Sequence, residues 1–163
     1  MNIFYLSHNR EEIPSMMVDK HIVKMILETS QILSTAHRFL DGNNNVLSDD
    51  RNNILYKATH INHPSTKWAR STTNNYIWTT NHLKEIADEY SYRYGKIHKS
   101  MKLYNYLKNP PKNITDGEFT PPPSCMDKQY IISNDTVENY RTYYKYGKSH
   151  IHKWTGRNVP IWI

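Results

Sequence analysis

The feature that most constrains the fold is an apolar repeat that runs from Pro14 to Arg38. Its apolar side chains recur every three or four residues, and this spacing places them on one face of a helix. A second repeat runs from Thr72 or Thr73 to Tyr94, and Gly95 is suited to end it because glycine tolerates left-handed backbone angles. Two amphipathic helices of this length must bury their apolar faces, so the sequence predicts a mainly α-helical fold. On the first repeat this face comprises Val18, Ile22, Met25, Ile26, Thr29, Ile32, Leu33 and Ala36.

The length of the chain suits one domain. At 163 residues it can form a substantial core, and no linker divides it, so we expect a single compact helical domain over residues 1–163. Asn2 to Leu6 alternate in a short extended pattern ahead of the first helix. Residues Asn109–Cys125 contain two runs of consecutive prolines, which are incompatible with a regular helix. We expect this segment to form an extended, proline-rich arm over the surface.

Shorter elements fill the intervals between these segments. The turn His60–Pro64 predicts a helix preceded by Asn62 or His63, with Pro64 in its first turn. Lys96 to Leu107 predicts a shorter helix. Asn134-Asp135 suits the N-cap of a last helix from about Thr136 to His150. The final residues, Pro160–Ile163, are apolar enough to dock on the body of the protein.

The charge balance favours a polyanionic partner. Lys and Arg number 21 against 15 Asp and Glu, which gives a net charge of +6. The single cysteine, Cys125, excludes an internal disulfide and a cysteine-rich zinc site. Residues 1–14 lack the apolar core of a signal peptide, and no apolar run approaches the roughly 20 residues that a membrane span needs. We therefore expect a cytoplasmic protein with no membrane partner, while its oligomeric state is not predicted.

The abundance of Asn, Lys, Ile and Tyr is typical of an AT-rich coding genome, including those of viruses and phages. For a viral protein the expected location is the cytoplasm of the host cell.

A row of ionisable residues borders the apolar face of the first helix. His21, Lys24 and Glu28 are spaced by three and four residues, so their side chains follow one another along one face. One interpretation is a solvated surface with an ordinary Lys24–Glu28 ion pair. The other makes Glu28 an acid/base residue, with Lys24 as the partner of an anionic substrate, because a carboxylate at the margin of a core can have an altered proton affinity.

A metal site is the alternative for the same region. His60 and His63 lie in one tight turn, and together with His21 or Glu28 they could supply nitrogen and oxygen ligands to a divalent metal. This grouping would suit a metal-dependent nuclease or phosphohydrolase. The simpler interpretation of His63 is that it caps the helix that follows it.

The segment Asn139–Arg157 carries five cationic residues and no acidic one, interleaved with tyrosines. Basic side chains neutralise phosphates and aromatic rings stack on exposed bases, so the segment favours nucleic acid as a ligand. The alternative is that about half of these aromatic residues pack inward. Arg70 is a further candidate for a phosphate contact. Within the segment the candidate DNA-binding residues are Arg141, Tyr144, Lys145, Tyr146 and Lys148.

Four short motifs together resemble the pyrimidine-dimer DNA glycosylase family, of the endonuclease V type found in phages and some bacteria. The opening Met1–Leu6 is similar to the start of that family, and Glu28 lies on the first long helix, where the family keeps its catalytic glutamate. Asn62-His63-Pro64 resembles an Asn-His-Pro turn of its bacterial branch. The segment Tyr143–Lys148 resembles the aromatic, lysine-rich C-terminal part of the family.

The resemblance implies a mainly helical DNA repair enzyme that needs no metal and no other cofactor. Its N-terminal amine would attack the sugar C1′ of a damaged nucleotide, and the resulting Schiff base would permit strand cleavage by β-elimination. Asn2 is not a residue whose preceding Met is usually removed, so the implied catalytic residues are Met1 and Glu28. Lys20 and Lys24 would hold phosphates, and the tyrosine-rich helix would meet the distorted or flipped bases.

The chain also departs from the family pattern. Lysines replace arginines near the glutamate, and the proline-rich arm exceeds the compact form of the family. A non-enzymatic protein that binds nucleic acid, or a viral protein that interacts with the host, is therefore kept as a further alternative.

Overall fold

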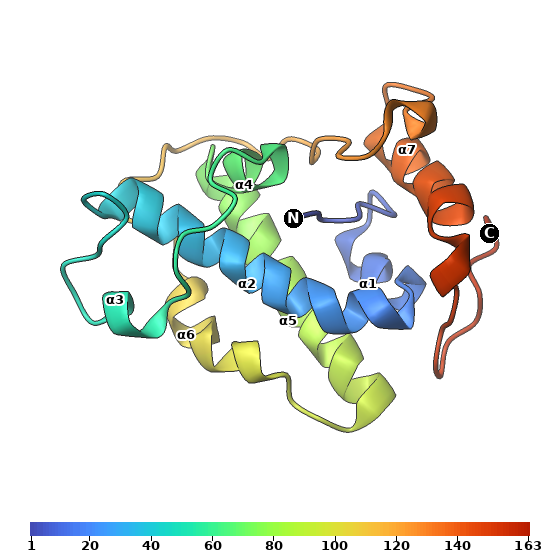
Figure 1. Cartoon of the computed structure of the whole chain (residues 1–163), viewed down its shortest axis with the longest axis horizontal. Coiled ribbons are helices and arrows are strands. Elements are labelled where there is room, and N and C mark those ends of the chain that lie inside the picture. The colour runs from blue at the N-terminus through green and yellow to red at the C-terminus, as the bar shows by residue number, and fades with distance from the viewer.

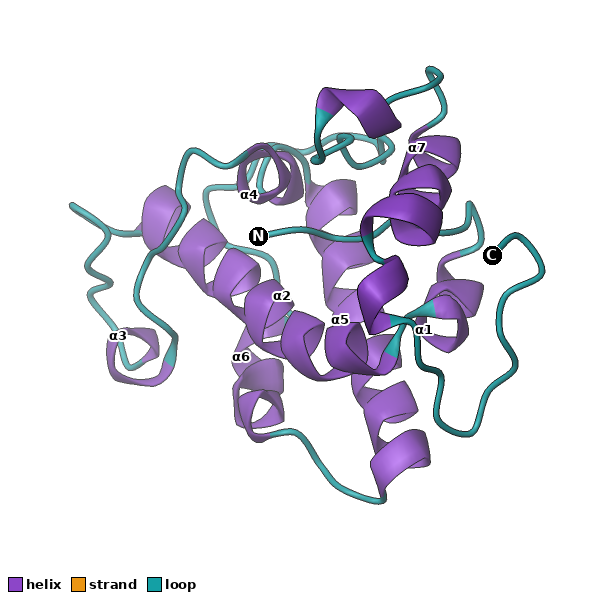
Figure 2. Ribbon diagram, turned by 45° about the vertical axis from the view of Figure 1, so that its right-hand side comes forward, coloured by secondary structure: helices purple, strands orange, loops and turns teal.

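The computed structural model describes all residues from Met1 to Ile163, and it is mainly α-helical, as the sequence predicts. Two long helices dominate it, and the shorter helices and loops pack around them (Figure 1). No β-strand is present (Figure 2). The helices are α1 (Ile13–Met16), α2 (Asp19–Asp41), α3 (Arg51–Ile54), α4 (Pro64–Ala69), α5 (Thr73–Tyr94), α6 (Tyr104–Leu107) and α7 (Thr136–Thr142). Short 3-10 helices cover Arg10–Glu12, Lys99–Leu103, Lys128–Tyr130 and Ser149–Ile151, and a π-helical turn covers Tyr143–Gly147.

The core lies where α2 and α5 cross, near the centre of both views (Figures 1 and 2). The predicted apolar face of α2 is buried along its length, so the 3.6-residue repeat identified the correct side of this helix. The core continues into the N-terminal segment and α7. Its fully enclosed side chains include Ile3, Leu6, Ile22, Ile26, Leu33, Tyr76, Leu83, Ile86, Tyr140 and Tyr144.

The first long helix is interrupted, which corrects the expectation of one helix from Pro14 to Arg38. The chain leaves α1 at Met17, whose ψ of 138° is extended, and α2 starts at Asp19. Arg93 of α5 explains the break. Its guanidinium donates to the carbonyls of Pro14 and Ser15 at 3.2 and 3.3 Å, which are the acceptors that a continuous helix would use. The amide of Asp19 instead donates to the carbonyl of Lys153 at 2.8 Å.

The capping predictions are confirmed at three helices. Gly95 follows α5 with a φ of +63°, His63 accepts the amide of Ser65 at the start of α4, and Asp135 accepts the amide of Val137 at the start of α7.

Two predicted helices are wrong in form. Lys96–Leu107 contains a 3-10 helix followed by one α-helical turn, and Thr136–His150 changes from α to π geometry after Thr142.

Residues 109–125 form the expected irregular arm, which runs along the upper edge of the molecule in Figure 1 between α6 and α7. The arm is fastened to the two helices beneath it. The indole of Trp68 donates to the carbonyl of Thr120 at 2.9 Å, and the amide of Thr120 donates to Asn75 at 2.9 Å. These bonds satisfy backbone groups that have no partner within the arm itself.

The C-terminal tail contacts the start of α2. The amide and the hydroxyl of Thr155 donate to the carboxylate of Asp19 at 2.8 and 2.7 Å. Trp162 packs against the core, whereas Ile161 is fully exposed, so only part of the tail docks as predicted. None of the helices has the length and apolar character required to span a bilayer.

Candidate active site

The N-terminus meets the middle of α2. The amine nitrogen of Met1 lies 3.6 Å from Oε2 of Glu28, and the backbone amide of Asn2 donates to the same oxygen at 3.3 Å. On the other side, Nζ of Lys24 lies 3.1 Å from Oε1. The Lys24 side chain is one helical turn away, as the i,i+4 spacing predicted. The side chain of Glu28 is only 13% exposed, so most of its hydration is replaced by these three nitrogen groups.

A cavity of about 180 Å³ opens beside this carboxylate. Three positively charged groups surround it, namely the Met1 amine, Lys24 and Lys148, and Glu28 is the only acidic residue in its wall. The cavity therefore carries a net positive charge that suits an anionic ligand. Its lining residues are Met1, Asn2, Phe4, His21, Lys24, Met25, Glu28, Tyr143 and Lys148.

Phe4 turns the N-terminal segment into this wall. Its φ of +55° lies in the left-handed region, which costs a non-glycine residue about 1 kcal/mol or more. The short extended pattern expected for Asn2–Leu6 is therefore interrupted at Phe4. The ring of Phe4 stacks on His21 with a centroid distance of 4.1 Å and meets Tyr144 edge-on. This aromatic packing supports the strained conformation.

His21 packs among aromatic residues, against Phe4 and Tyr144. It is 6% exposed, and its Nδ1 makes a hydrogen bond with the hydroxyl of Tyr144 at 2.6 Å. Burial, together with the charges of Lys148 and Lys24, lowers the pKa of His21 to about 3, so the ring is neutral at pH 7. Tyr144 is itself fully buried. The ring of Tyr144 is therefore not exposed in this conformation, and its contact with DNA stays a prediction.

The grouping of His21, Glu28, His60 and His63 as metal ligands is not assembled. No three His, Cys, Asp or Glu side chains lie close enough together to hold a metal ion. His63 uses one ring nitrogen to cap α4, and His60 is exposed with its Nδ1 on the hydroxyl of Thr59 at 2.8 Å. Burial, followed by the positive charge of the Met1 amine, lowers the pKa of His63.

The π-helical turn contributes two residues to the cavity wall. Tyr143 and Lys148 are five residues apart, which is the spacing of hydrogen-bonded partners in a π-helix, and Nζ of Lys148 lies 4.8 Å from the centre of the Tyr143 ring. Gly147 permits this arrangement, because a Cβ there would lie 2.6 Å from the Tyr143 ring. The sequence analysis placed Tyr143 in the aromatic, lysine-rich segment but did not select it as a site residue, since a 3.6-residue period cannot reveal a π-turn. The run of tyrosines ending in glycine was the only available signal.

The other candidate DNA-binding residues differ in accessibility. Lys20 is exposed near the start of α2, Tyr146 is 64% exposed, and Lys145 lies beside the Tyr146 ring. Arg141 is half-buried and donates to the carbonyl of Leu6 at 2.8 Å. For these residues DNA contact stays a prediction.

Arg70 is placed differently from the expectation. It is 8% exposed, donates to the carbonyl of Ile61 at 2.8 Å and stacks over Phe39. Arg70 thus supports the turn before α4, and in this conformation it does not offer a surface contact to a phosphate.

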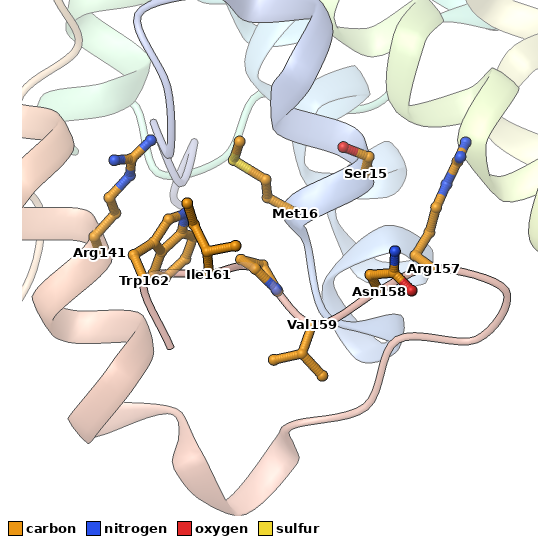
Figure 3. A pocket seen from close by; sticks show the side chains of 9 residues that line it. Ser15, Met16, Arg141, Arg157, Asn158, Val159, Ile161 and Trp162 are labelled. Carbon is orange, nitrogen blue, oxygen red and sulfur yellow. The ribbon is translucent and has the colours of Figure 1, made fainter.

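The largest cavity, of about 430 Å³, lies elsewhere, between α1 and the C-terminal tail. Figure 3 shows Arg141 and Trp162 on one side of it and Arg157 on the other. Neither Met1 nor Glu28 borders this cavity. Size alone therefore does not identify the site where the amine and the carboxylate meet.

Comparison with known families gives one match. A family model described as pyrimidine dimer DNA glycosylase matches residues 1–103. No curated protein and no solved structure matches the chain. The matched region contains Met1, Lys24 and Glu28, whereas the arm, α7 and the π-turn lie beyond it.

Proposed function

The chain belongs to the pyrimidine dimer DNA glycosylase family, and on this basis we propose that it is a DNA glycosylase with abasic-site lyase activity. Family membership supports DNA binding and a glycosylase-type repair reaction. We assign the amine of Met1 as the nucleophile and Glu28 as its acid/base partner. Lys20, Lys24 and Lys148 are assigned to the DNA phosphates around the cavity.

The observation that carries this proposal is the pairing of an amine with a largely buried carboxylate at 3.6 Å, at the edge of a positively charged cavity. An α-amine is a nucleophile in its neutral form, which forms a Schiff base with a sugar carbon at the aldehyde level of oxidation. The carboxylate of Glu28 can accept the proton that the amine loses on attack. Because its position on α2 is set by the helix, the partner is rigidly placed before substrate arrives.

The reaction begins with attack of the neutral amine on C1′ of the damaged nucleotide. The C1′–N bond breaks, and the base leaves with the bonding electrons and takes up a proton. The nitrogen gives a proton to Glu28, and opening of the sugar produces an iminium ion at C1′. This positive charge lies within reach of the Glu28 carboxylate, which stabilises it.

Strand cleavage follows from the same intermediate. Removal of a proton from C2′ breaks the C3′–O bond, and the 5′-phosphate end of the downstream strand departs. Water then hydrolyses the iminium ion and releases the amine. The cations in the cavity wall bind the flanking phosphates throughout these steps. Lys24 can reach a phosphate because 67% of its side chain is exposed.

The direct test is borohydride trapping with duplex DNA that carries either an abasic site or ultraviolet damage. We expect a covalent adduct with both substrates, and peptide mapping should place it on the first residue. Selective blocking of the N-terminal amine should abolish the adduct. An adduct that survives blocking, or DNA binding with no adduct on either substrate, would overturn the assignment and favour a lysine nucleophile or a binding protein.

Intact-mass measurement should accompany this test, because two nitrogens lie near the same oxygen. The Met1 amine is 3.6 Å and the Asn2 nitrogen 3.3 Å from Oε2 of Glu28. Retention of Met1 is expected, and its removal would transfer the role of nucleophile to Asn2.

A further inference from the structure

We propose that Asn2 is a positioning residue, whose side chain is clamped between the arm and α7 so that the amine next to it faces Glu28. This inference rests on the proposed function, since it concerns the same nucleophile. The first residues of a chain are usually poorly ordered unless something ties them down. Here the tie is made by the side chain of the second residue.

The clamp has three hydrogen bonds. Nδ2 of Asn2 donates to the carbonyl of Cys125 at 2.8 Å, where the arm ends. Oδ1 of Asn2 accepts from the hydroxyl of Tyr140 at 2.5 Å and from the amide of Ile3 at 2.8 Å. The amide group of Asn2 thus uses both of its donor and acceptor sides, and its orientation is determined by its partners.

Tyr140 is suited to hold Oδ1 because it remains a donor. The residue is fully buried, and burial raises the pKa of its phenol far above the ordinary value, so the hydroxyl keeps its proton. The carbonyl of Pro123 lies 3.0 Å from the same hydroxyl, which has one proton to give. Donation from the Tyr140 hydroxyl to Oδ1 of Asn2 is favoured. If the proton pointed to Pro123 instead, the Tyr140 oxygen and Oδ1 of Asn2 would face each other without a proton between them at 2.5 Å.

The clamp acts on the amine through very few bonds. The backbone nitrogen of Asn2 forms the peptide bond to Met1, and the same nitrogen donates a hydrogen bond to Oε2 of Glu28 at 3.3 Å. The side chain of Met1 is only 2% exposed, so packing holds the residue on its other side. With both neighbours restrained, the amine samples few orientations, and attack on C1′ depends strongly on orientation.

Two of the three partners of the Asn2 side chain, Cys125 and Tyr140, lie outside the family-matched residues 1–103. Cys125 ends the proline-rich arm, and Tyr140 lies on α7. The inference therefore gives the arm a role in the reaction, since the arm fixes the acceptor that orients Asn2. A purely structural role for the same contacts would stabilise the arm without affecting the chemical step.

The test uses two variants of the full-length protein. Tyr140→Phe removes only the hydroxyl, and Asn2→Leu removes the clamped amide while keeping a large second residue, so that Met1 is retained, as intact mass will verify. The control is Tyr76→Phe, because Tyr76 of α5 is equally buried and donates its hydroxyl to the carbonyl of Leu107 in α6 at 2.7 Å, and it does not line the cavity beside Glu28.

Single-turnover trapping with abasic-site DNA at saturating protein should separate chemistry from binding. We expect the trapping rate of both test variants to fall by about tenfold or more, with DNA affinity within about twofold of the wild type. The rate for Tyr76→Phe should be unchanged. A parallel fall in the control, a loss confined to DNA affinity, or unchanged rates in Tyr140→Phe and Asn2→Leu would each overturn the positioning role.

The wild-type measurement separates this inference from the proposed function. If the wild type forms no adduct, the proposed function fails. If the wild type forms the adduct at the N-terminus and the clamp variants do so equally fast, only the role of Asn2 fails.

Discussion

The family-matched residues 1–103 and the residues that follow them build the site in different ways. The first region supplies Glu28 and Lys24 from a long regular helix, whose register sets their spacing. The second supplies Tyr143, Lys148 and the clamp on Asn2 from a π-turn, a short helix and an irregular arm. The comparison teaches that the proposed acid/base residue and its lysine neighbour are presented by regular structure, while the proposed nucleophile and the groups that enclose and orient it lie in segments held by individual hydrogen bonds.

The regular region should itself depend on one irregular contact, at Arg93. Its side chain is fully buried and pairs with Asp19 and Glu89 at 2.9 and 2.7 Å. Arg93→Met leaves these carboxylates without their central cation, so we expect unfolding free energy to fall by about 3–5 kcal/mol. Urea denaturation of the variant and the wild type measures this difference in unfolding free energy. Arg10→Met, which breaks a more exposed pair with Glu85, should cost about 1 kcal/mol or less, and equal losses would contradict the special role of Arg93.

Glu28 tests the contribution of the first region to chemistry. Glu28→Gln keeps the shape of the side chain but removes the base, so the rate of adduct formation should fall by roughly a hundredfold or more. Single-turnover trapping at saturating protein measures this rate. Glu11→Gln, at an exposed position of the N-terminal 3-10 helix, should react like the wild type. A Glu28→Gln variant with normal trapping would remove this carboxylate from the reaction.

Gly147 tests the contribution of the second region. In Gly147→Ala the new Cβ would lie 2.6 Å from the Tyr143 ring, so the π-turn must shift, at a cost of about 1–3 kcal/mol. We expect slower trapping together with this loss of stability. Gly117→Ala is the control, because there the new Cβ would lie 2.9 Å from the side chain of Thr72, the N-cap of α5, and neither residue lines the cavity beside Glu28. If both variants trap DNA equally fast, the wall formed by Tyr143 is not needed.

Acidification should weaken the helix pair through His82 of α5. Burial lowers the pKa of His82 to about 3, and both of its ring nitrogens lack hydrogen-bond partners. In the unfolded chain His82 has its ordinary pKa of about 6.5, whereas in the folded protein its pKa is about 3. The contribution of this residue to stability is therefore fully present above pH 6.5 and is lost progressively as the pH falls toward 3. Between pH 7 and 5 this residue should cost about 2 kcal/mol. Urea denaturation at pH 7 and pH 5 measures this loss of unfolding free energy. The loss should be about 2 kcal/mol smaller in His82→Leu than in the wild type. In His150→Gln, which changes an exposed histidine, the loss should equal that of the wild type.

The smallest effect is expected for Lys148. If its ammonium group contacts a phosphate, Lys148→Gln should lower the slope of log affinity against log salt by about one. Binding titrations on intact duplex DNA at several salt concentrations measure the slope. Lys84→Gln, which affects a surface lysine paired with Asp88, should leave it unchanged. An unchanged slope for Lys148→Gln would confine that lysine to its contact with Tyr143.

These differences also explain what could be read from the sequence. The long helices, their buried faces and the caps at Gly95, His63 and Asp135 follow from local periodicity and local hydrogen bonding, and the sequence predicted them. The i,i+4 pair of Lys24 and Glu28 is local in the same sense.

The rest depends on contacts between distant segments. The break after α1 depends on Arg93, which lies 79 residues after its hydrogen-bond partner Pro14. Tyr143, and not the expected Tyr144, lines the cavity because of the π-turn, which has no simple sequence signature. The burial of Arg70 likewise depends on how the turn at Ile61 folds back onto it.

The clamp on Asn2 has a consequence for the order in which the protein is made. Asn2 is among the first residues to leave the ribosome, and its partners Cys125 and Tyr140 follow 123 and 138 residues later. Until then the amine is unprotected, and an acetyl group added to the nascent chain would remove both its charge and its nucleophilicity. If the Met1 amine is the nucleophile, as proposed, such a modification would abolish adduct formation whether or not the clamp on Asn2 forms afterwards.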